Sequence, residues 1–250
     1  MVLLIVGLLC AAPWLGGPGF VVWAMVFVLP WVIGFGSVYT IHLVVIFLAS
    51  SLVLHLLAAP PSVILGKGSG LSLYFYVVLL IGPLRRSLVW LRAGKFNFGS
   101  VALMVGIVLV SAIAVILWTH YTPQSPAIHG RILPANVPGY LVPIYMGAFA
   151  MVNSLIEEII WRGVMLTALE AAFGVGAFSL VLQAVQFGLA HYRRGFPNGW
   201  SGAGLTFLFG LAMGVLRRRS GGLVVPWIAH AAADFTIVWL VAHHVGMNAS

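Results

Sequence analysis

Six ionisable side chains in the second half of the chain have the types and the spacing that could do chemistry. They are Glu157, Glu158, Arg162, His191, His230 and Asp234. A desolvated carboxylate can act as a general base, one imidazole can hold a water molecule against it, and a second imidazole can stabilise an oxyanion. Glutamate and histidine are also ordinary zinc ligands, although no HExxH pattern is present. The set therefore predicts water activation, and a metal site is the alternative.

Covalent catalysis is the weaker interpretation, because no serine or cysteine has an evident base beside it. Cys10 lies in a distant apolar segment, and Ser154 is one ordinary serine in a predicted helix. Glu158 and Arg162 are four residues apart, so they share a helix face and can form an internal ion pair. This pairing leaves Glu157, about 100° round the helix, without a partner.

These charges stand in a chain that otherwise avoids charge. Hydrophobic residues make up 62% of the 250 residues and charged residues only 6%, whereas soluble domains have about 25% charged residues. The protein is therefore predicted to be an integral membrane protein, in which buried ionisable groups are functional candidates by default. The net charge of +8 does not indicate nucleic acid, because the basic residues cluster at the ends of apolar segments.

The elements that must position these side chains are membrane-spanning helices, since long apolar runs in lipid favour helices over strands. The fold class is predicted to be all-α, a polytopic transmembrane bundle of about eight helices, or nine if the short segment 1–14 is counted. A proline-rich loop, 119–137, divides an amino-terminal bundle and external loop, 1–137, from a catalytic core, 138–250. The expected spans are 19–39, 40–59, 71–92, 98–118, 138–170, 174–192, 200–216 and 222–244, with 1–14 as a short ninth candidate.

Hairpin geometry predicts that three of the candidates converge. The turn at 171–176 lies about 16 residues after Glu157 and about 17 before His191, which puts both at nearly the same height. From the next turn, at 217–222, His230 rises about 13 Å and comes within reach of that height. On the helix between them, Gly210 and Gly214 form a GxxxG pair that permits close packing.

Three short motifs on these helices match a known family. EEIIWR at 157–162 fits EExxxR, FGLAH at 187–191 fits FxxxH, and HAAAD at 230–234 fits HxxxN/D. Over roughly 140–245 the chain resembles the CPBP family of intramembrane endopeptidases, which includes CAAX proteases and bacteriocin-processing proteins. Residues 1–137 contribute nothing to the resemblance.

The resemblance implies a role for each candidate. Glu157 would be the catalytic base, His191 would position the water, and Glu158 with Arg162 would brace the site. His230 and residue 234 would form the oxyanion side. Position 234 departs from the prenyl-protein endopeptidase branch, which usually has Asn, because an ionised Asp234 cannot donate a hydrogen bond. Asp234 is therefore protonated, orients His230 or binds a metal.

The predicted function is an intramembrane endopeptidase that processes the C-terminal tail of a membrane-associated or exported protein. Its partners would be a peptide or protein with a hydrophobic or lipidated C-terminal segment and membrane lipid, without nucleic acid. No cofactor is required on this interpretation, although zinc is possible. The alternatives are a metal-dependent peptidase on the same residues, a non-catalytic immunity or assembly protein, and a proton-coupled transporter.

The orientation follows from the two densest basic clusters, at 85–95 and 217–219, which the positive-inside rule puts in the cytoplasm. His191 then lies near the outer face of what is expected to be a bacterial or archaeal inner membrane. An outward site suits the trimming of exported proteins better than the processing of cytosolic prenylated proteins. Arg193 and Arg194 count against this orientation, because they would lie outside, beside the site.

Overall fold

The structure is a computed structural model that describes residues 1–57, 63–122, 129–130, 132–134 and 137–248. Regular structure in these residues is helical. The helices of the first half are α1 Val2–Ala11, α2 Pro18–Phe35, α3 Val38–Leu56, α4 Val63–Leu80, α5 Gly82–Arg86 and α6 Phe98–Tyr121. The second half has a 3-10 turn Gly139–Leu141, α8 Val142–Glu157, a π-helix Glu158–Met165, α9 Leu166–Phe173, α10 Ala177–Arg194, α11 Gly199–Ser220 and α12 Val224–Asn248.

Local sequence explains where several helices begin and end. Ser37 and Asn97 cap α3 and α6, since each side-chain oxygen accepts a hydrogen bond from the backbone N–H three residues on. Gly221 ends α11 in the left-handed region at φ 67°, which glycine adopts without steric cost. The tight turn that follows returns the chain directly into α12.

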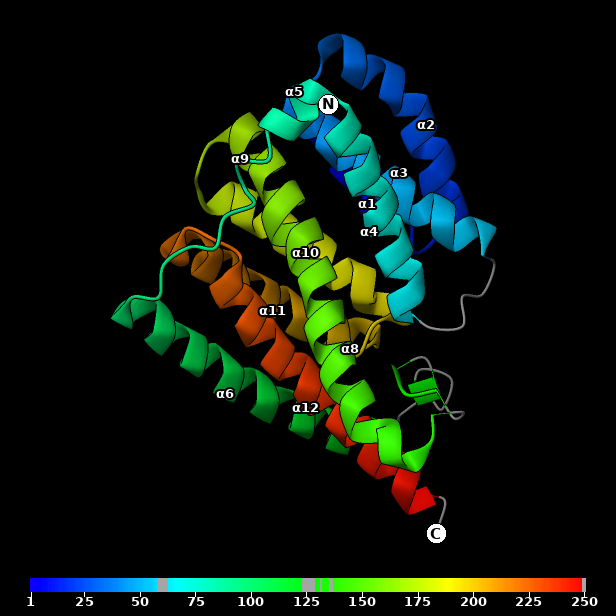
Figure 1. Ribbon diagram of the computed structural model, residues 1–250, viewed down its shortest axis with the longest axis vertical. Helices are drawn as coiled ribbons and strands as arrows, with labels where there is room; N and C mark the ends of the chain where they lie inside the picture. Colours follow the sequence, from blue (N-terminus) through cyan, green and yellow to red (C-terminus); the bar gives the residue numbers. More distant parts are fainter. Residues whose placement is uncertain (58–62, 123–128, 131, 135–136, 249–250) are drawn as a thin grey trace.

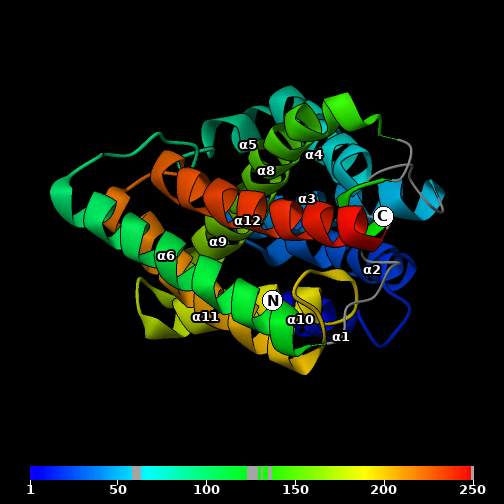
Figure 2. The ribbon, with the colours of Figure 1, turned by 90° about the horizontal axis from the view of Figure 1, so that it is seen from below.

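A continuous rod formed by α8, the π-helix and α9 runs through the middle of the bundle (Figure 1). Helix α3 packs against the π-helix and α9, and α4 packs against α8. On the other side, α12 packs against α8, and α6 lies along α11 and α12 (Figure 2). The rod therefore contacts helices from both halves of the chain. The predicted division at residue 137 stays a prediction.

The bundle has the dimensions and the surface of a membrane protein. Six helical segments in the described part are long and apolar enough to cross a membrane, and two shorter apolar helices accompany them. Helix α2 exposes an aromatic stripe at four-residue spacing, formed by Trp23, Phe27, Trp31 and Phe35. Such a stripe is costly in water and favourable in lipid. The predicted class, a polytopic helical bundle, is confirmed.

The predicted span 71–92 is wrong in its bounds, because α4 runs from Val63 to Leu80. The expected spans leave out the glycine-rich stretch GKGSG, 66–70, which lies within α4. In the structure Gly70 lets α4 approach α3, since a Cβ there would lie 2.6 Å from Cα of Ser50. Helix α4 ends at Leu80, shortly before Pro83. Proline has no N–H with which to continue the hydrogen bonding of α4, and Pro83 lies in the first turn of the short helix α5.

The GxxxG pair acts as the sequence predicts and brings α11 against α10. A Cβ on Gly210 would lie 3.2 Å from Cα of Ala184, and one on Gly214 would lie 2.6 Å from Cδ2 of Leu180. Close packing at these two glycines fixes α10, which carries His191, relative to the hairpin that leads to His230.

Candidate active site

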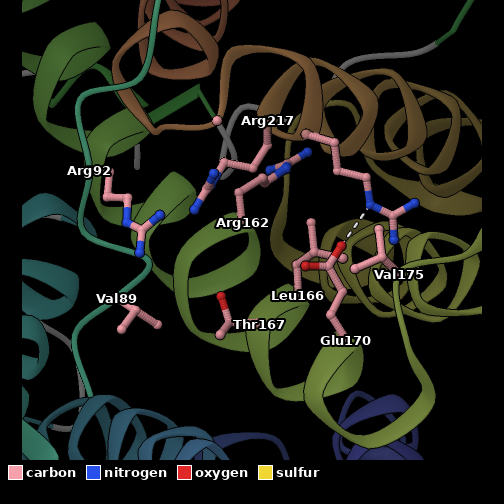
Figure 3. A pocket seen from close by; sticks show the side chains of 10 residues that line it. Val89, Arg92, Arg162, Leu166, Thr167, Glu170, Val175 and Arg217 are labelled. Atoms are coloured by element: carbon pink, nitrogen blue, oxygen red, sulfur yellow. Dashed lines mark hydrogen bonds and ion pairs between the residues drawn. The ribbon is translucent and has the colours of Figure 1, made fainter.

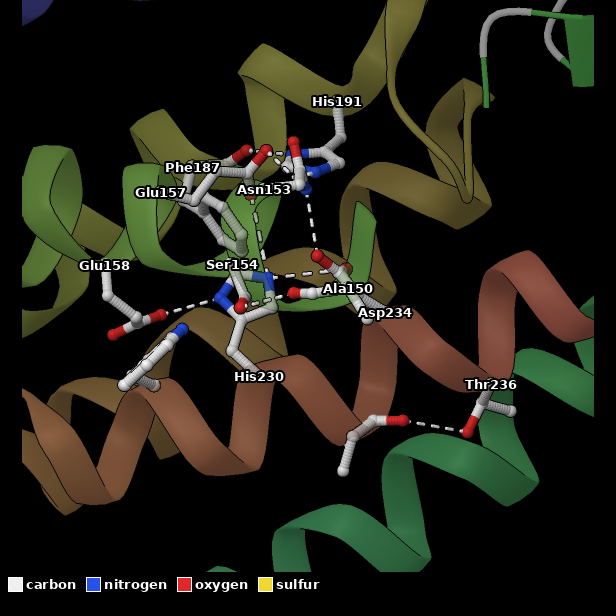
Figure 4. Close-up of polar contacts among 12 residues, drawn as sticks. Ala150, Asn153, Ser154, Glu157, Glu158, Phe187, His191, His230, Asp234 and Thr236 are labelled. Atoms are coloured by element: carbon white, nitrogen blue, oxygen red, sulfur yellow. Dashed lines mark hydrogen bonds and ion pairs between the residues drawn. The ribbon is translucent and has the colours of Figure 1, made fainter. Parts of the chain in front are cut away.

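Glu157 lies where α8 passes into the π-helix, at the junction of α8, α10 and α12. Its Oε2 is 3.9 Å from Nε2 of His191 and 3.7 Å from Nε2 of His230. The structure thus brings together the three side chains that the hairpin geometry predicts (Figure 4). Both distances are too long for direct hydrogen bonds, and they suit a shared water molecule between the groups.

The π-helix carries the buried brace of the site. Nη1 of Arg162 donates to Oε1 of Glu158 at 3.0 Å, and Nδ1 of His230 lies 2.7 Å from the same oxygen. All three residues are buried. Because an ionised carboxylate only accepts hydrogen bonds, Nδ1 of His230 carries a proton and its Nε2 faces Glu157. The predicted ion pair between Glu158 and Arg162 is confirmed.

Helix α10 orients the second imidazole. Nδ1 of His191 lies 2.9 Å from the carbonyl oxygen of Phe187 and donates to it, so that Nε2 points toward Glu157. The ring of Phe187 also lies under the Arg162 guanidinium, whose Cζ is 4.5 Å from the ring centroid. Phe187 therefore contacts both Arg162, through a cation–π contact, and His191, through an aromatic contact.

Asp234 is placed as an acceptor in this site. Its Oδ2 accepts a hydrogen bond from Nδ2 of Asn153 at 2.9 Å, and its Oδ1 lies 3.7 Å from Nε2 of His230. Asn153 is one turn before Glu157 on α8 and is a site residue that the sequence analysis missed. The only sequence signal for Asn153 was an amide side chain in an apolar run, four residues before Glu157 and therefore on the same helix face.

Lys67 is the larger omission. Its ammonium lies 2.5 Å from Oε1 of Glu157 and 2.9 Å from Oδ1 of Asn153, and 27% of its side chain is exposed. It reaches the site from α4, outside the region that carries the family motifs. Because Lys67 lies outside the expected spans, it had no predicted position. The available signal was a single cation between two apolar runs.

Ser154 has no base and is excluded as an activated nucleophile by its contacts. Its Oγ donates to the carbonyl oxygens of Ala150 and Met151, which is ordinary bonding of a helix serine to the preceding turn. The described residues contain no group of three or more His, Cys, Asp or Glu side chains arranged to hold a metal ion. At Glu157 the Lys67 ammonium, bound to Oε1, adds a positive charge that disfavours a divalent cation.

Comparison with known proteins reaches the same region of the chain. Residues 138–236 match the family model described as Type II CAAX prenyl endopeptidase Rce1-like. The match confirms that this region resembles the CAAX protease (CPBP) family. Apart from Lys67, every side chain of the site described above lies within the matched CAAX protease region. No curated protein and no solved structure matches the chain.

The CAAX protease match supports an intramembrane protease at the level of the family. The roles of Glu157, Glu158, Arg162, His191, His230 and Asp234 stay predictions. The site nevertheless has a clear division: a buried brace on one side of Glu157, two imidazole nitrogens facing one of its oxygens, and a cation on the other oxygen.

Proposed function

We propose that the protein is an intramembrane endopeptidase in which Glu157 activates the water that hydrolyses a peptide bond. The observation that carries this proposal is the different environment of the two carboxylate oxygens. Oε1 is bound by Lys67 at 2.5 Å, whereas Oε2 faces the Nε2 atoms of His191 and His230. One oxygen is thus held in place and the other is available for water.

A water molecule at Oε2 can donate one hydrogen to Glu157 and the other to Nε2 of His191. Its lone pair is then free to attack the carbonyl carbon of the substrate. As the C–O bond forms, Glu157 takes one proton from the water, and the carbonyl oxygen becomes an oxyanion. Glu157 then returns this proton to the leaving nitrogen as the C–N bond breaks. The products are a new carboxyl terminus and an amine.

His230 is the proposed donor to the oxyanion. Glu158 holds its Nδ1–H, and in the doubly protonated ring Nε2–H can donate toward the space beside Glu157. Asp234 has the position of an orienting acceptor, because it lies 3.7 Å from the same Nε2 and is itself held by Asn153. This assignment gives Asp234 a role that does not require it to donate a hydrogen bond.

The proposed substrate is a peptide or protein with a hydrophobic or lipidated C-terminal segment. Support comes from the family description, which names prenyl endopeptidases, and from a site that lies among membrane-spanning helices. The positive-inside rule favours an outward-facing site in a bacterial or archaeal inner membrane, hence the tail of an exported or membrane-associated protein. Membrane lipid would be the second partner.

The test compares the C-terminal sequences of membrane-associated proteins in cells that express the wild type, Glu157→Gln or Ser154→Ala at equal levels. Mass spectrometry should detect shortened C termini with the wild type and with Ser154→Ala, and lose them with Glu157→Gln. Ser154→Ala is the matched control, because Ser154 lies one turn from Glu157 and bonds only to its own helix. Shortened C termini that persist with Glu157→Gln would reject the proposed base.

The metal-dependent alternative has its own test. The purified enzyme is treated exhaustively with a chelator and then assayed on a substrate found in the first experiment. We expect activity to be retained, because the ammonium of Lys67 bound to Glu157 repels a divalent cation. If activity is lost and returns with stoichiometric zinc, a metal ion rather than Glu157 alone activates the water.

A further inference from the structure

A second polar cavity lies away from Glu157, where the last turn of α11 meets α9 and the segment after α5 (Figure 3). Its volume is about 300 Å³. Four guanidinium groups and one carboxylate line it, together with apolar side chains. These charged residues are Arg92, Arg162, Arg217, Arg218 and Glu170. The cavity is therefore strongly basic.

Its guanidinium groups have donors that the described residues leave unused. Arg162 has a relative exposure of 0%, and only its Nη1 has a partner, Glu158, while Nε and Nη2 have none. Arg217 donates from Nη2 to the carbonyl oxygen of Trp90 at 3.1 Å, and its buried Nε is also unpaired. A buried donor without a partner costs free energy, so three such atoms around one cavity point to a missing acceptor.

The positive charges that line the cavity exceed the negative charges. Glu170 is the only carboxylate in its lining, and Arg218 binds it through Nε at 2.6 Å. Arg217 is attracted by Glu170 and repelled by Arg92, and neither arginine forms an ion pair with a carboxylate among the described residues. Because Arg92 is exposed, an anion can reach the cavity from the surface. The missing acceptor is thus negatively charged.

We propose that this cavity binds a phosphate or phosphodiester group. The planar fork of arginine matches phosphate oxygens in pairs, and a phosphate can accept from several guanidinium groups at once. Arg217 and Arg218 lie in the last turn of a candidate membrane span, Gly199–Ser220. The end of a membrane span is expected at the depth of lipid headgroups. Basic pockets between helices at that depth bind anionic lipids. A phospholipid headgroup and free phosphate are the two sources of this chemistry.

Binding to the full-length purified protein can be measured without any peptidase substrate. One arm adds inorganic phosphate to protein in neutral detergent at constant ionic strength. The other compares vesicles of phosphatidylcholine with vesicles that also contain phosphatidylglycerol. The readout is the apparent Tm, which should rise on the order of 5 °C when the site is saturated.

The variants are Arg217→Gln and Arg92→Gln, with Arg219→Gln as the matched control. Arg219 belongs to the same arginine triplet but does not line the cavity. Arg92→Gln is included because Arg92 is exposed, so its replacement leaves the folded core intact even if Arg217→Gln does not fold. Arg162 is left unchanged, since it also belongs to the proposed active site.

We expect stabilisation that both variants reduce at least tenfold in apparent affinity and that Arg219→Gln retains. A response to phosphatidylglycerol alone identifies a lipid headgroup, and a response to inorganic phosphate in detergent identifies a free phosphate. The proposal is overturned if neither probe stabilises the wild type, or if Arg92→Gln responds as the wild type does. Because turnover is not measured, either result stands apart from the proposed peptidase function.

Discussion

Two buried polar clusters meet at the π-helix Glu158–Met165, and their charges are satisfied in different ways. Around Glu157, the acids are matched by Lys67, by Arg162 and by two imidazole rings. Around the basic cavity, four arginines face one carboxylate, and buried guanidinium donors are left without partners. In the first cluster, Glu157, Glu158 and Asp234 each lie beside a cationic or imidazole group. In the second cluster, the unpaired donors of Arg162 and Arg217 are those that we propose bind an anion.

Arg162 joins the two clusters, because its Nη1 donates to Glu158, its Nε and Nη2 have no partner among the described residues, and its side chain lines the basic cavity. A buried ion pair is weak evidence for stability by itself, since desolvation offsets most of the attraction. We infer that this pair has a positional role. It holds the Glu158 carboxylate against Nδ1 of His230.

The largest effect is expected from Glu157→Gln in the purified enzyme. Removing a positioned general base lowers turnover by about 10²- to 10⁴-fold, because the glutamine amide cannot take the proton of the attacking water. The measurement is kcat/KM on an identified substrate. Ser154→Ala should stay close to the wild type, and a comparable loss in that variant would point to a serine nucleophile instead.

The second prediction concerns Arg162, which belongs to both clusters. Arg162→Gln leaves Glu158 as a buried, partly unpaired charge, which should lower the free energy of unfolding by about 3–5 kcal/mol. The double variant Glu158→Gln with Arg162→Gln should recover part of this loss. Denaturant unfolding in detergent measures both. An Arg162→Gln protein as stable as Arg219→Gln would contradict the assigned brace.

The third prediction concerns the cation on Glu157. Charge-assisted hydrogen bonds contribute about 1.5–3 kcal/mol, so Lys67→Met should lower kcat roughly 10- to 100-fold by releasing the carboxylate from its position. Lys67→Arg keeps the charge and should restore part of the rate. Lys95→Met is the matched control, because Lys95 is the other lysine of the chain and is exposed.

A higher kcat in Lys67→Met would reverse this assignment, since Lys67 would then block the base rather than hold it. KM distinguishes the two roles further. A positioning residue should change kcat with little change in KM, whereas a group that competes with substrate should change KM.

The smallest functional effect is expected from single cysteines that report the orientation of the two clusters. In a Cys10→Ser background, cysteines at Asn198 and Arg219 mark opposite ends of α11, about 32 Å apart. With an impermeant thiol reagent on intact cells, we expect labelling at 198 and none at 219 until the membrane is broken. The reverse pattern would turn the proposed site to the cytoplasm and favour a cytosolic substrate.

The sequence was sufficient for the fold class and for one face of the site. Apolar runs of spanning length predicted a polytopic bundle because lipid leaves the backbone few other choices. Spacing along single helices predicted the pair of Glu158 with Arg162, and hairpin arithmetic predicted the meeting of Glu157 with His191 and His230. These contacts are local or lie between helices joined by short turns.

Only the tertiary structure decided which distant side chains complete the clusters. Lys67 is 90 residues from Glu157, and its helix contains glycines, which are poor helix formers but permit close packing in the bundle. Arg92 and Arg217 are also far apart in the chain and come together because the segment after α5 lies against the turn between α11 and α12. Periodicity gives the direction of a side chain within one helix. The relative positions of helices that are not neighbours in sequence depend on packing, and that packing determines which charges meet.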